Sequence, residues 1–220
     1  MSYSLNEVES TAKKAARGVG YSWGLAEDTA KSARWLCGQN IDGCAVLARH
    51  LEYVDQFDIA SLTPVVNGKQ WQALNAHMCP VLAGTALSDR ASLFDEDGIN
   101  LLSVSEPLML LYFAALVAQF CRMKGRDRAV VVVSWPGCRC STDGASLTVF
   151  GSENQHSSEC AVQVTLNFDD MVGLPQTRCD RANPTERSLK ILNNFAFRTY
   201  APATEASRLS GAGAGQSDND

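Results

Sequence analysis

The sequence predicts a single α+β domain, with an N-terminal helical layer, a mainly antiparallel sheet and a central buried helix. Three patterns carry this prediction: helical apolar spacing in the first third, short β-branched runs in the second half, and a long apolar run between them. At 220 residues, 45% of them hydrophobic, the chain can bury one well-formed core. We place this domain at residues 1–209, followed by a Gly/Ala-rich C-terminal tail at residues 210–220.

Three helices are expected in the N-terminal third. Ser4 and Glu7 have the spacing of a capping box, which opens the first helix. The second helix runs from about Ser22 to Gly38, and its small alanines indicate close packing against a neighbour. Asp42 is placed to cap the third helix, at residues 43–54.

Short strands are expected next. The dipeptide Asn67-Gly68 lies between extended residues, which is a strong signal for a β-hairpin. Pro64 and Pro80 restrict the strands around them to short or edge positions. A further strand is predicted at residues 99–104.

The central helix is predicted from Ser105 to Met123. Ser105 is read as its cap, Glu106 as an acid near the positive end of the helix, and Pro107 as its early proline. The residues that follow are apolar on nearly all sides, so this helix is expected to be buried through the centre of the fold.

The second half predicts a meander and a last helix. Residues 129–135 form a continuous β-branched run, typical of a central strand that is covered on both faces. With residues 146–150 and 160–166 this run is expected to form an antiparallel meander. Asn183 is read as the cap of a final helix, with a proline in its first turn.

Composition narrows the class of protein. The formal net charge of −5 and the lack of any basic run longer than Lys13-Lys14 argue against a nucleic-acid binder. The longest apolar run, residues 108–120, is shorter than the roughly 20 residues that span a bilayer. The start, MSYSLNEVES, lacks the pattern of an export signal. We therefore expect a soluble, cytoplasmic protein whose eight cysteines are free.

Two cysteines are the candidate nucleophiles. Cys138 and Cys140 flank Arg139 on an expected loop after the buried strand, and a neighbouring cation lowers a thiol pKa. A general base would come from His77 or His156. The alternative is that the two cysteines are only small residues in a tight hairpin loop.

A zinc site is a further alternative, although no metal or cofactor is assigned. Zinc takes four nitrogen or sulfur ligands, which the sequence could supply from Cys138, Cys140, His156 and Cys160, with Cys179 in reserve. The competing interpretation is that these are buried free cysteines, which are common in protein cores.

The same core interpretation is applied to Cys37 and Cys44, which flank the segment GQNIDG. His50 lies next to Arg49 and close to Glu52, so it is expected to be a surface histidine.

A polar cluster near the C-terminus is the candidate substrate-binding site. Thr204, Glu205, Ser207 and Arg208 could hold a carboxylate or phosphate through the arginine fork. The alternative is that these residues form only the solvent-exposed polar face of a short amphipathic helix.

The tail, SGAGAGQSDND, is not expected to bind a nucleotide, because no helix follows its glycines. It is expected either to fray or to pack on a folded surface with its terminal acids near basic side chains.

The two ends of the chain, SLNEVESTAKKAARGVGYSWGLAED and TYAPATEASRLSGAGAGQSDND, together resemble an uncharacterised proteobacterial family of about this length, a domain of unknown function. The resemblance implies a short cytoplasmic protein of the kind encoded among genes of small-molecule catabolism. It carries over no activity and no catalytic residue.

Three hypotheses for function follow. The first is an enzyme, or the small subunit of one, acting on a small polar or anionic metabolite. The second is a non-catalytic assembly or regulatory protein that docks its tail on a partner or on its own oligomer. The third is a zinc-stabilised module. A small-molecule ligand and a homo-oligomer or partner subunit are thus expected, without nucleic acid or membrane.

Overall fold

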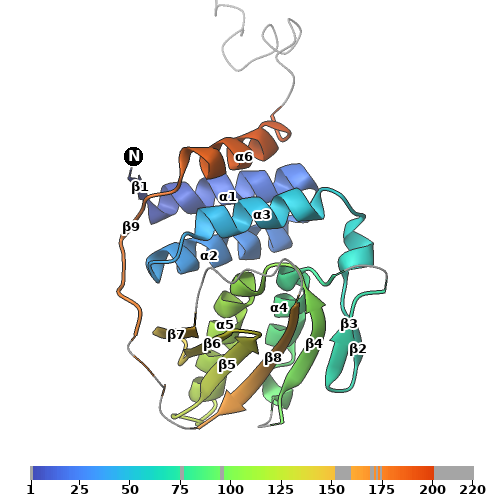
Figure 1. Cartoon of the computed structure of the whole chain (residues 1–220), viewed down its shortest axis with the longest axis vertical. Helices are drawn as coiled ribbons and strands as arrows, with labels where there is room; N and C mark the ends of the chain where they lie inside the picture. Colours follow the sequence, from blue (N-terminus) through green and yellow to red (C-terminus); the bar gives the residue numbers. More distant parts are fainter. Residues whose placement is uncertain are drawn as a thin grey trace, which may run out of the picture.

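The computed structural model describes residues 2–74, 77–94, 97–151, 160–168, 171, 173 and 175–200. They form an α+β fold, as the sequence predicted, in which a layer of helices lies above a sheet with two helices on its face (Figure 1). One hydrophobic cluster includes side chains of both layers, from Val8 to Phe195. None of the described helices is long and apolar enough to span a membrane.

Four helices make the upper layer: α1 (Leu5–Val19), α2 (Trp23–Gly38), α3 (Gly43–Val54) and α6 (Glu186–Phe197). Helix α1 packs against both α2 and α6 (Figure 1). Small residues allow this close approach. Ala12, Ala16 and Ala30 are fully buried, and a Cβ on Gly18 would overlap the backbone of Phe195 in α6.

The predicted caps of the first and third helices are confirmed, and so is the predicted start of the second near Ser22. The Ser4 hydroxyl accepts the Glu7 N–H, and the Glu7 carboxylate accepts the Ser4 N–H at 2.7 Å, which completes the capping box. Ser22 caps α2, and the Asp42 carboxylate accepts the Ala45 N–H at the start of α3. In α6 the cap is Thr185 rather than Asn183.

Two short strands tie the ends of the upper layer together. Strand β1 (Tyr3–Ser4) pairs antiparallel with β9 (Arg181–Ala182), just before α6. The Arg181 guanidinium also donates to Ser2. The start of α1 and the approach to α6 are therefore held side by side.

The described sheet has the strand order β2-β3-β4-β8-β5-β6-β7, and every neighbouring pair except β3–β4 is antiparallel. The strands are β2 (Val65–Asn67), β3 (Gln70–Gln72), β4 (Ile99–Val104), β5 (Val130–Trp135), β6 (Cys138–Thr142), β7 (Leu147–Gly151) and β8 (Cys160–Asn167). The hairpin at Asn67-Gly68 and the strand at residues 99–104 are confirmed.

The predicted meander is wrong in two respects. Strand β6 was missed, and it lies between β5 and β7. Strand β8 does not continue beside β7; it inserts between β4 and β5. That insertion makes β5 a central strand, and Val130 to Val133 are all buried, as expected for a strand covered on both faces.

Two helices, α4 (Pro80–Asp89) and α5 (Leu110–Met123), lie against one face of the sheet (Figure 1). Helix α4 was not expected. Pro80 is its first residue, a position that tolerates proline because the missing N–H would be unpaired there anyway, so the strand reading of Pro80 was wrong. Gly84 of α4 lies so close to Phe113 of α5 that a Cβ would overlap the ring.

The start of the central helix also differs from the prediction. A 3₁₀ turn, Pro107–Met109, precedes α5, and Ser105 makes no capping bond. Glu106 instead accepts two hydrogen bonds from the Arg49 guanidinium in α3. Helix α5 is buried over most of its surface, but Gln119 is exposed, so it is not covered on every side.

Candidate functional site

Cys138 and Cys140 lie on a strand, not on a loop. A two-residue turn containing Gly137, whose φ is +81°, joins β5 directly to β6. Both thiols are buried on the same side of β6, with their sulfurs 3.8 Å apart. Arg139 is exposed on the opposite side because neighbouring strand residues alternate between faces, so its cation does not lie between the thiols. The nucleophilic role of the two cysteines remains a prediction.

The proposed zinc ligands lie on different elements of the fold, with Cys138 and Cys140 on β6. Cys160 begins β8, and Cys179 lies outside the sheet, where its thiol donates to the Asn40 side chain at 3.3 Å. Within the described ranges, no three His, Cys, Asp or Glu side chains are arranged to hold a metal ion. His156 lies outside the described residues.

The predicted substrate-binding cluster and the tail at 210–220 lie outside the described residues. The cluster comprises Thr204, Glu205, Ser207 and Arg208.

The prediction for His50 is wrong, because the structure buries this histidine completely. Its Nε2 lies 2.9 Å from the Tyr21 hydroxyl, which lies 3.0 Å from the Cys79 sulfur. All three side chains are fully buried. Burial lowers the pKa of His50 to about 3 and raises the pKa values of Tyr21 and Cys79, so the cluster is uncharged near neutral pH.

This buried cluster joins three parts of the fold. Tyr21 comes from the turn between α1 and α2, His50 from α3, and Cys79 from the residue that precedes α4. Because no member reaches solvent, we assign the cluster to the structural core rather than to a ligand site.

One open site of the upper layer is a basic groove with a volume of about 480 Å³. It lies between α1, the first residue of α2 and the end of α6, three elements that are adjacent because α1 packs on both of the others. We call it the basic groove, and its lining residues are Ser10, Lys13, Lys14, Arg17, Trp23, Arg198 and Thr199.

Helical spacing explains the α1 side of the groove. Lys13 and Lys14 follow Ser10 by three and four residues, and Arg17 follows them by four and three, so the four side chains share one side of the helix. The apolar residues of α1 occupy the neighbouring face, which packs on the core. This local pattern therefore directs the cations of α1 toward a single strip of surface.

The Trp23 ring lies next to two of these cations, Lys13 and Arg17. Its side chain is 65% exposed, which is unusual for so large an apolar group. The Arg17 guanidinium lies 4.5 Å from the centroid of the indole ring, and Lys13 Nζ lies 5.7 Å away. Both are within the range of a cation–π interaction.

Carboxylates neutralise only part of the groove's charge. Lys13 pairs with Glu27, and Arg198 forms a two-point pair with Asp55 at the end of α3, where one N–O distance is 2.9 Å. These bonds lower the pKa values of Glu27 and Asp55, so both acids stay ionised at neutral pH.

Two cations of the groove are not neutralised by a carboxylate of the described residues. Among the residues that the structure describes, Lys14 and Arg17 make no ion pair. Lys14 Nζ instead lies 5.9 Å from the ring centroid of Tyr200, and Arg17 donates to the backbone oxygen of Tyr21. The groove therefore keeps a net positive charge in a protein whose overall charge is negative.

Sequence reasoning missed this groove, although part of the signal was present. Lys13-Lys14 is the longest basic run in the chain, and Arg17 follows at helical spacing. No local pattern connects these residues to Arg198, which only the packing of α6 on α1 brings to the same site.

The comparisons with known proteins reach only the first part of the chain. Residues 3–79 match a family described as "Protein of unknown function (DUF3726)". This range includes α1 to α3 and the β2–β3 hairpin, and with them the groove residues from Ser10 to Trp23. It leaves out Arg198, Thr199 and the C-terminal motif. No curated protein and no solved structure matches the chain.

Proposed function

We propose that this protein is an enzyme, or the small subunit of one, that acts on a small anionic metabolite, and that the basic groove binds the anion. The observation that carries the proposal is the set of four cationic side chains, from two helices, arranged around one exposed tryptophan. Two of these cations, Lys14 and Arg17, have no carboxylate partner in the described chain.

The lining indicates which ligands would fit. A guanidinium such as that of Arg17 binds a carboxylate or phosphate through parallel hydrogen bonds, and Lys14 adds a point charge. The exposed face of Trp23 can cover a flat or apolar body, while Ser10 and Thr199 provide hydroxyl groups. The volume of about 480 Å³ lies in the range of small-molecule sites. We infer a metabolite with a carboxylate or phosphate and a compact apolar part.

The groove supplies binding groups rather than a catalytic set. Among the residues that the structure describes, those that line the groove include no carboxylate, imidazole or thiol. A carboxylate, imidazole or thiol that acts as general base or nucleophile would come from another part of this chain or from a second subunit. This composition favours the small-subunit form of the proposal.

Titration calorimetry at low ionic strength tests the groove. The probes are phenyl phosphate, benzoate and inorganic phosphate, each titrated into the full chain. We expect the two aromatic anions to bind, and Lys14→Ala and Arg17→Met each to weaken binding about tenfold, the effect of losing one charge-assisted contact. Methionine keeps the apolar stem of Arg17 against Trp23.

The matched controls are Lys190→Ala and Arg187→Met, which remove exposed cations of α6 that do not line the groove. They should leave affinity unchanged. Equal affinities in all four variants, or no heat with any anion, would rule out the groove as the anion site.

A second candidate function is assembly, with the acidic tail as the occupant of this surface. Phe197 and Tyr200 are exposed aromatics that contact each other edge to face at 5.2 Å, where the described chain approaches residue 201. Beyond that point the sequence includes Asp218 and Asp220, which are complementary to the basic groove in charge.

Truncation after Leu209 tests both this candidate and the proposed boundary of the tail. If the tail occupies the groove, the shortened chain should bind phenyl phosphate more tightly. If it joins subunits, light scattering should show a smaller particle. If the shortened chain binds phenyl phosphate with the same affinity and forms particles with the same number of subunits, the tail is not docked. The anion proposal is unaffected by that result.

A further inference from the structure

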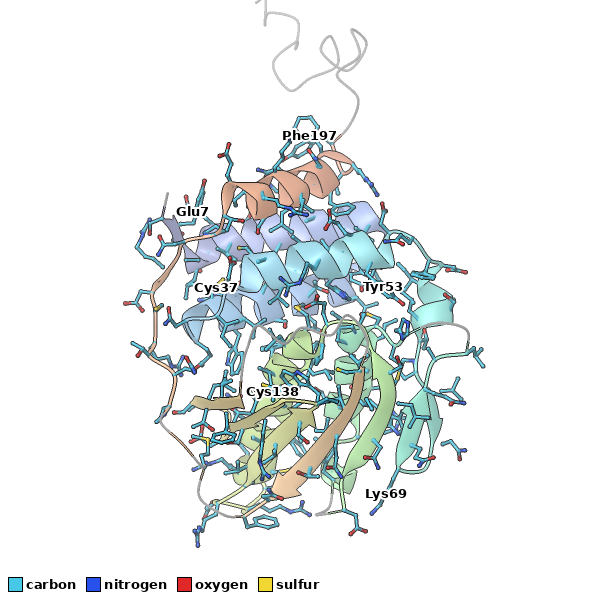
Figure 2. The ribbon with its side chains drawn as sticks, viewed as in Figure 1. Glu7, Cys37, Tyr53, Lys69, Cys138 and Phe197 are labelled. Atoms are coloured by element: carbon cyan, nitrogen blue, oxygen red, sulfur yellow. The ribbon has the colours of Figure 1, made fainter. Side chains whose placement is uncertain are left out.

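Two cysteines meet where α2 ends and α3 begins. Cys37 is in the last turn of α2, and Cys44 is in the first turn of α3. The turn between them is tight, and it holds Asn40 at a φ of +62°, a left-handed conformation that is uncommon for residues other than glycine. Figure 2 shows Cys37 at the end of the helical layer, beside the segment that leads to β9.

The start of α3 lies against the Cys37 sulfur. The Cys44 thiol and the backbone amides of Gly43 and Cys44 interact with this sulfur. These interactions lower the pKa of Cys37, although burial and the nearby Asp42 carboxylate oppose them. The pKa of Cys44 is raised, first by its hydrogen bond to Cys37 and then by burial.

Cys37 also has a route to a small reagent. It lines a cavity of about 180 Å³ on the surface of the upper layer. Asp42, Arg181 and a third cysteine, Cys179, are charged or titratable groups that line the same cavity. By contrast, burial raises the pKa values of Cys79 and Cys121, and neither lines this cavity.

We propose that Cys37 and Cys44 form an oxidant-sensitive dithiol, in which Cys37 reacts with a hydroperoxide and Cys44 closes a disulfide with it. The proposal rests on the contact between the two thiols, the amides aimed at Cys37 and the cavity that reaches it. It is independent of the basic groove.

The chemistry balances in two steps. The Cys37 thiolate attacks the terminal oxygen of the hydroperoxide, the O–O bond breaks, and the leaving alkoxide or hydroxide takes the thiol proton. This gives a sulfenic acid and an alcohol or water. The Cys44 sulfur then attacks the oxidised sulfur, an S–S bond forms, and water leaves with the Cys44 proton. The peroxide is reduced by two electrons and the two thiols are oxidised.

Peptide mapping of the full chain tests this directly. Trypsin cuts after Arg34 and Arg49, so residues 35–49 carry both cysteines in one peptide. After one equivalent of hydrogen peroxide at neutral pH, followed by iodoacetamide under denaturing conditions, this peptide should be two hydrogens lighter and carry no alkyl group. Reduction with a dithiol after the peroxide step and before alkylation should restore both alkylation sites.

Variants separate the roles of the two cysteines. In Cys44→Ser, Cys37 should stop at the sulfenic acid, which a 1,3-diketone traps. In Cys37→Ser, peroxide should leave Cys44 a free thiol. Cys121→Ser is the matched control and should form the disulfide as the wild type does. Each variant is first checked for a cooperative melt.

The peptide map of the wild-type chain tests the proposal without depending on the folding of any variant. Double alkylation of peptide 35–49 after peroxide would overturn it, and so would a cross-link from Cys37 to Cys179. We expect Cys37 to lose its free thiol at least about tenfold faster than Cys121, since each unit by which a thiol pKa falls raises its thiolate fraction about tenfold.

Discussion

The hydroxyl of Tyr21 lies 2.9 Å from Nε2 of His50, in a region of the fold where neither side chain reaches solvent. The contact joins the turn after α1 to the middle of α3, and the same hydroxyl reaches Cys79 at the start of α4. A histidine that looked like a surface residue is thus part of the bond network between the helical layer and the rest of the core.

Removing the hydroxyl should destabilise the protein. In Tyr21→Phe, His50 and Cys79 both lose the hydroxyl and keep only their long contact with each other at 3.9 Å, and a poorly satisfied buried polar group costs about 1–3 kcal/mol. Urea denaturation measures the change. Tyr112→Phe is the matched control, because the half-buried Tyr112 hydroxyl makes no hydrogen bond that the structure records. Equal midpoints for the two variants would contradict the role of the Tyr21 contact.

His50 should make stability depend on pH. Burial lowers its pKa in the folded state to about 3, below the ordinary value of 6.5, so the unfolded chain takes up a proton that the native chain refuses. The stability is fully present above pH 6.5 and is lost as the pH falls toward 3.

Between pH 8 and pH 5 this single group should remove about 2 kcal/mol of unfolding free energy. The His50→Gln variant should lose that much less than the wild type over the same interval, since all other titrating groups are shared. Chemical denaturation at a series of pH values measures both curves, and parallel curves would refute the assignment.

Two glycines in helices should respond oppositely to alanine. A Cβ on Gly84 would overlap the Phe113 ring where α4 packs on α5, so Gly84→Ala should lower stability by about 1–3 kcal/mol. Gly24, in the first turn of α2, has no atom within 4 Å of such a Cβ. Gly24→Ala should therefore raise stability by about 0.5 kcal/mol. Thermal melts of the two variants should shift in opposite directions.

The central helix should not accept a charge on its buried side. Leu111 and Ala115 of α5 are almost fully buried, and an unpaired buried charge costs several kcal/mol, comparable to the stability of a domain. Leu111→Asp and Ala115→Asp should each abolish the yield of folded protein. Met123→Asp, at a side chain that is 77% exposed, is the control and should fold. Cooperative melting of the two buried variants would argue against the position of α5.

Local chemistry, readable in the sequence, determined most of the helices and several strands. The Ser4–Glu7 capping box and the Asp42 cap depend on groups three residues apart, so their spacing alone is sufficient. Asn67-Gly68 works in the same way for the hairpin, because the turn it forms is a property of two residues.

Errors arose where a residue was suited to more than one role, local or distant. Pro80 restricts a strand but also begins a helix, and packing of α4 on α5 decided for the helix. Glu106 suits the first turn of a helix, yet it pairs with Arg49, a partner 57 residues away along the chain. Local preference is worth little compared with burial against a distant element, so it was overruled at both positions.

The sequence by itself thus determined the caps, the β-branched central strand and the run of cations along α1, since each depends on neighbours within a turn or a strand. Only the tertiary structure decided that β8 inserts between β4 and β5, that His50 is buried, and that Arg198 lines the same groove as Lys14. These arrangements depend on contacts between elements far apart in the chain. No local periodicity encodes them, because strand pairing and helix packing are chosen by how much apolar surface the whole fold can bury.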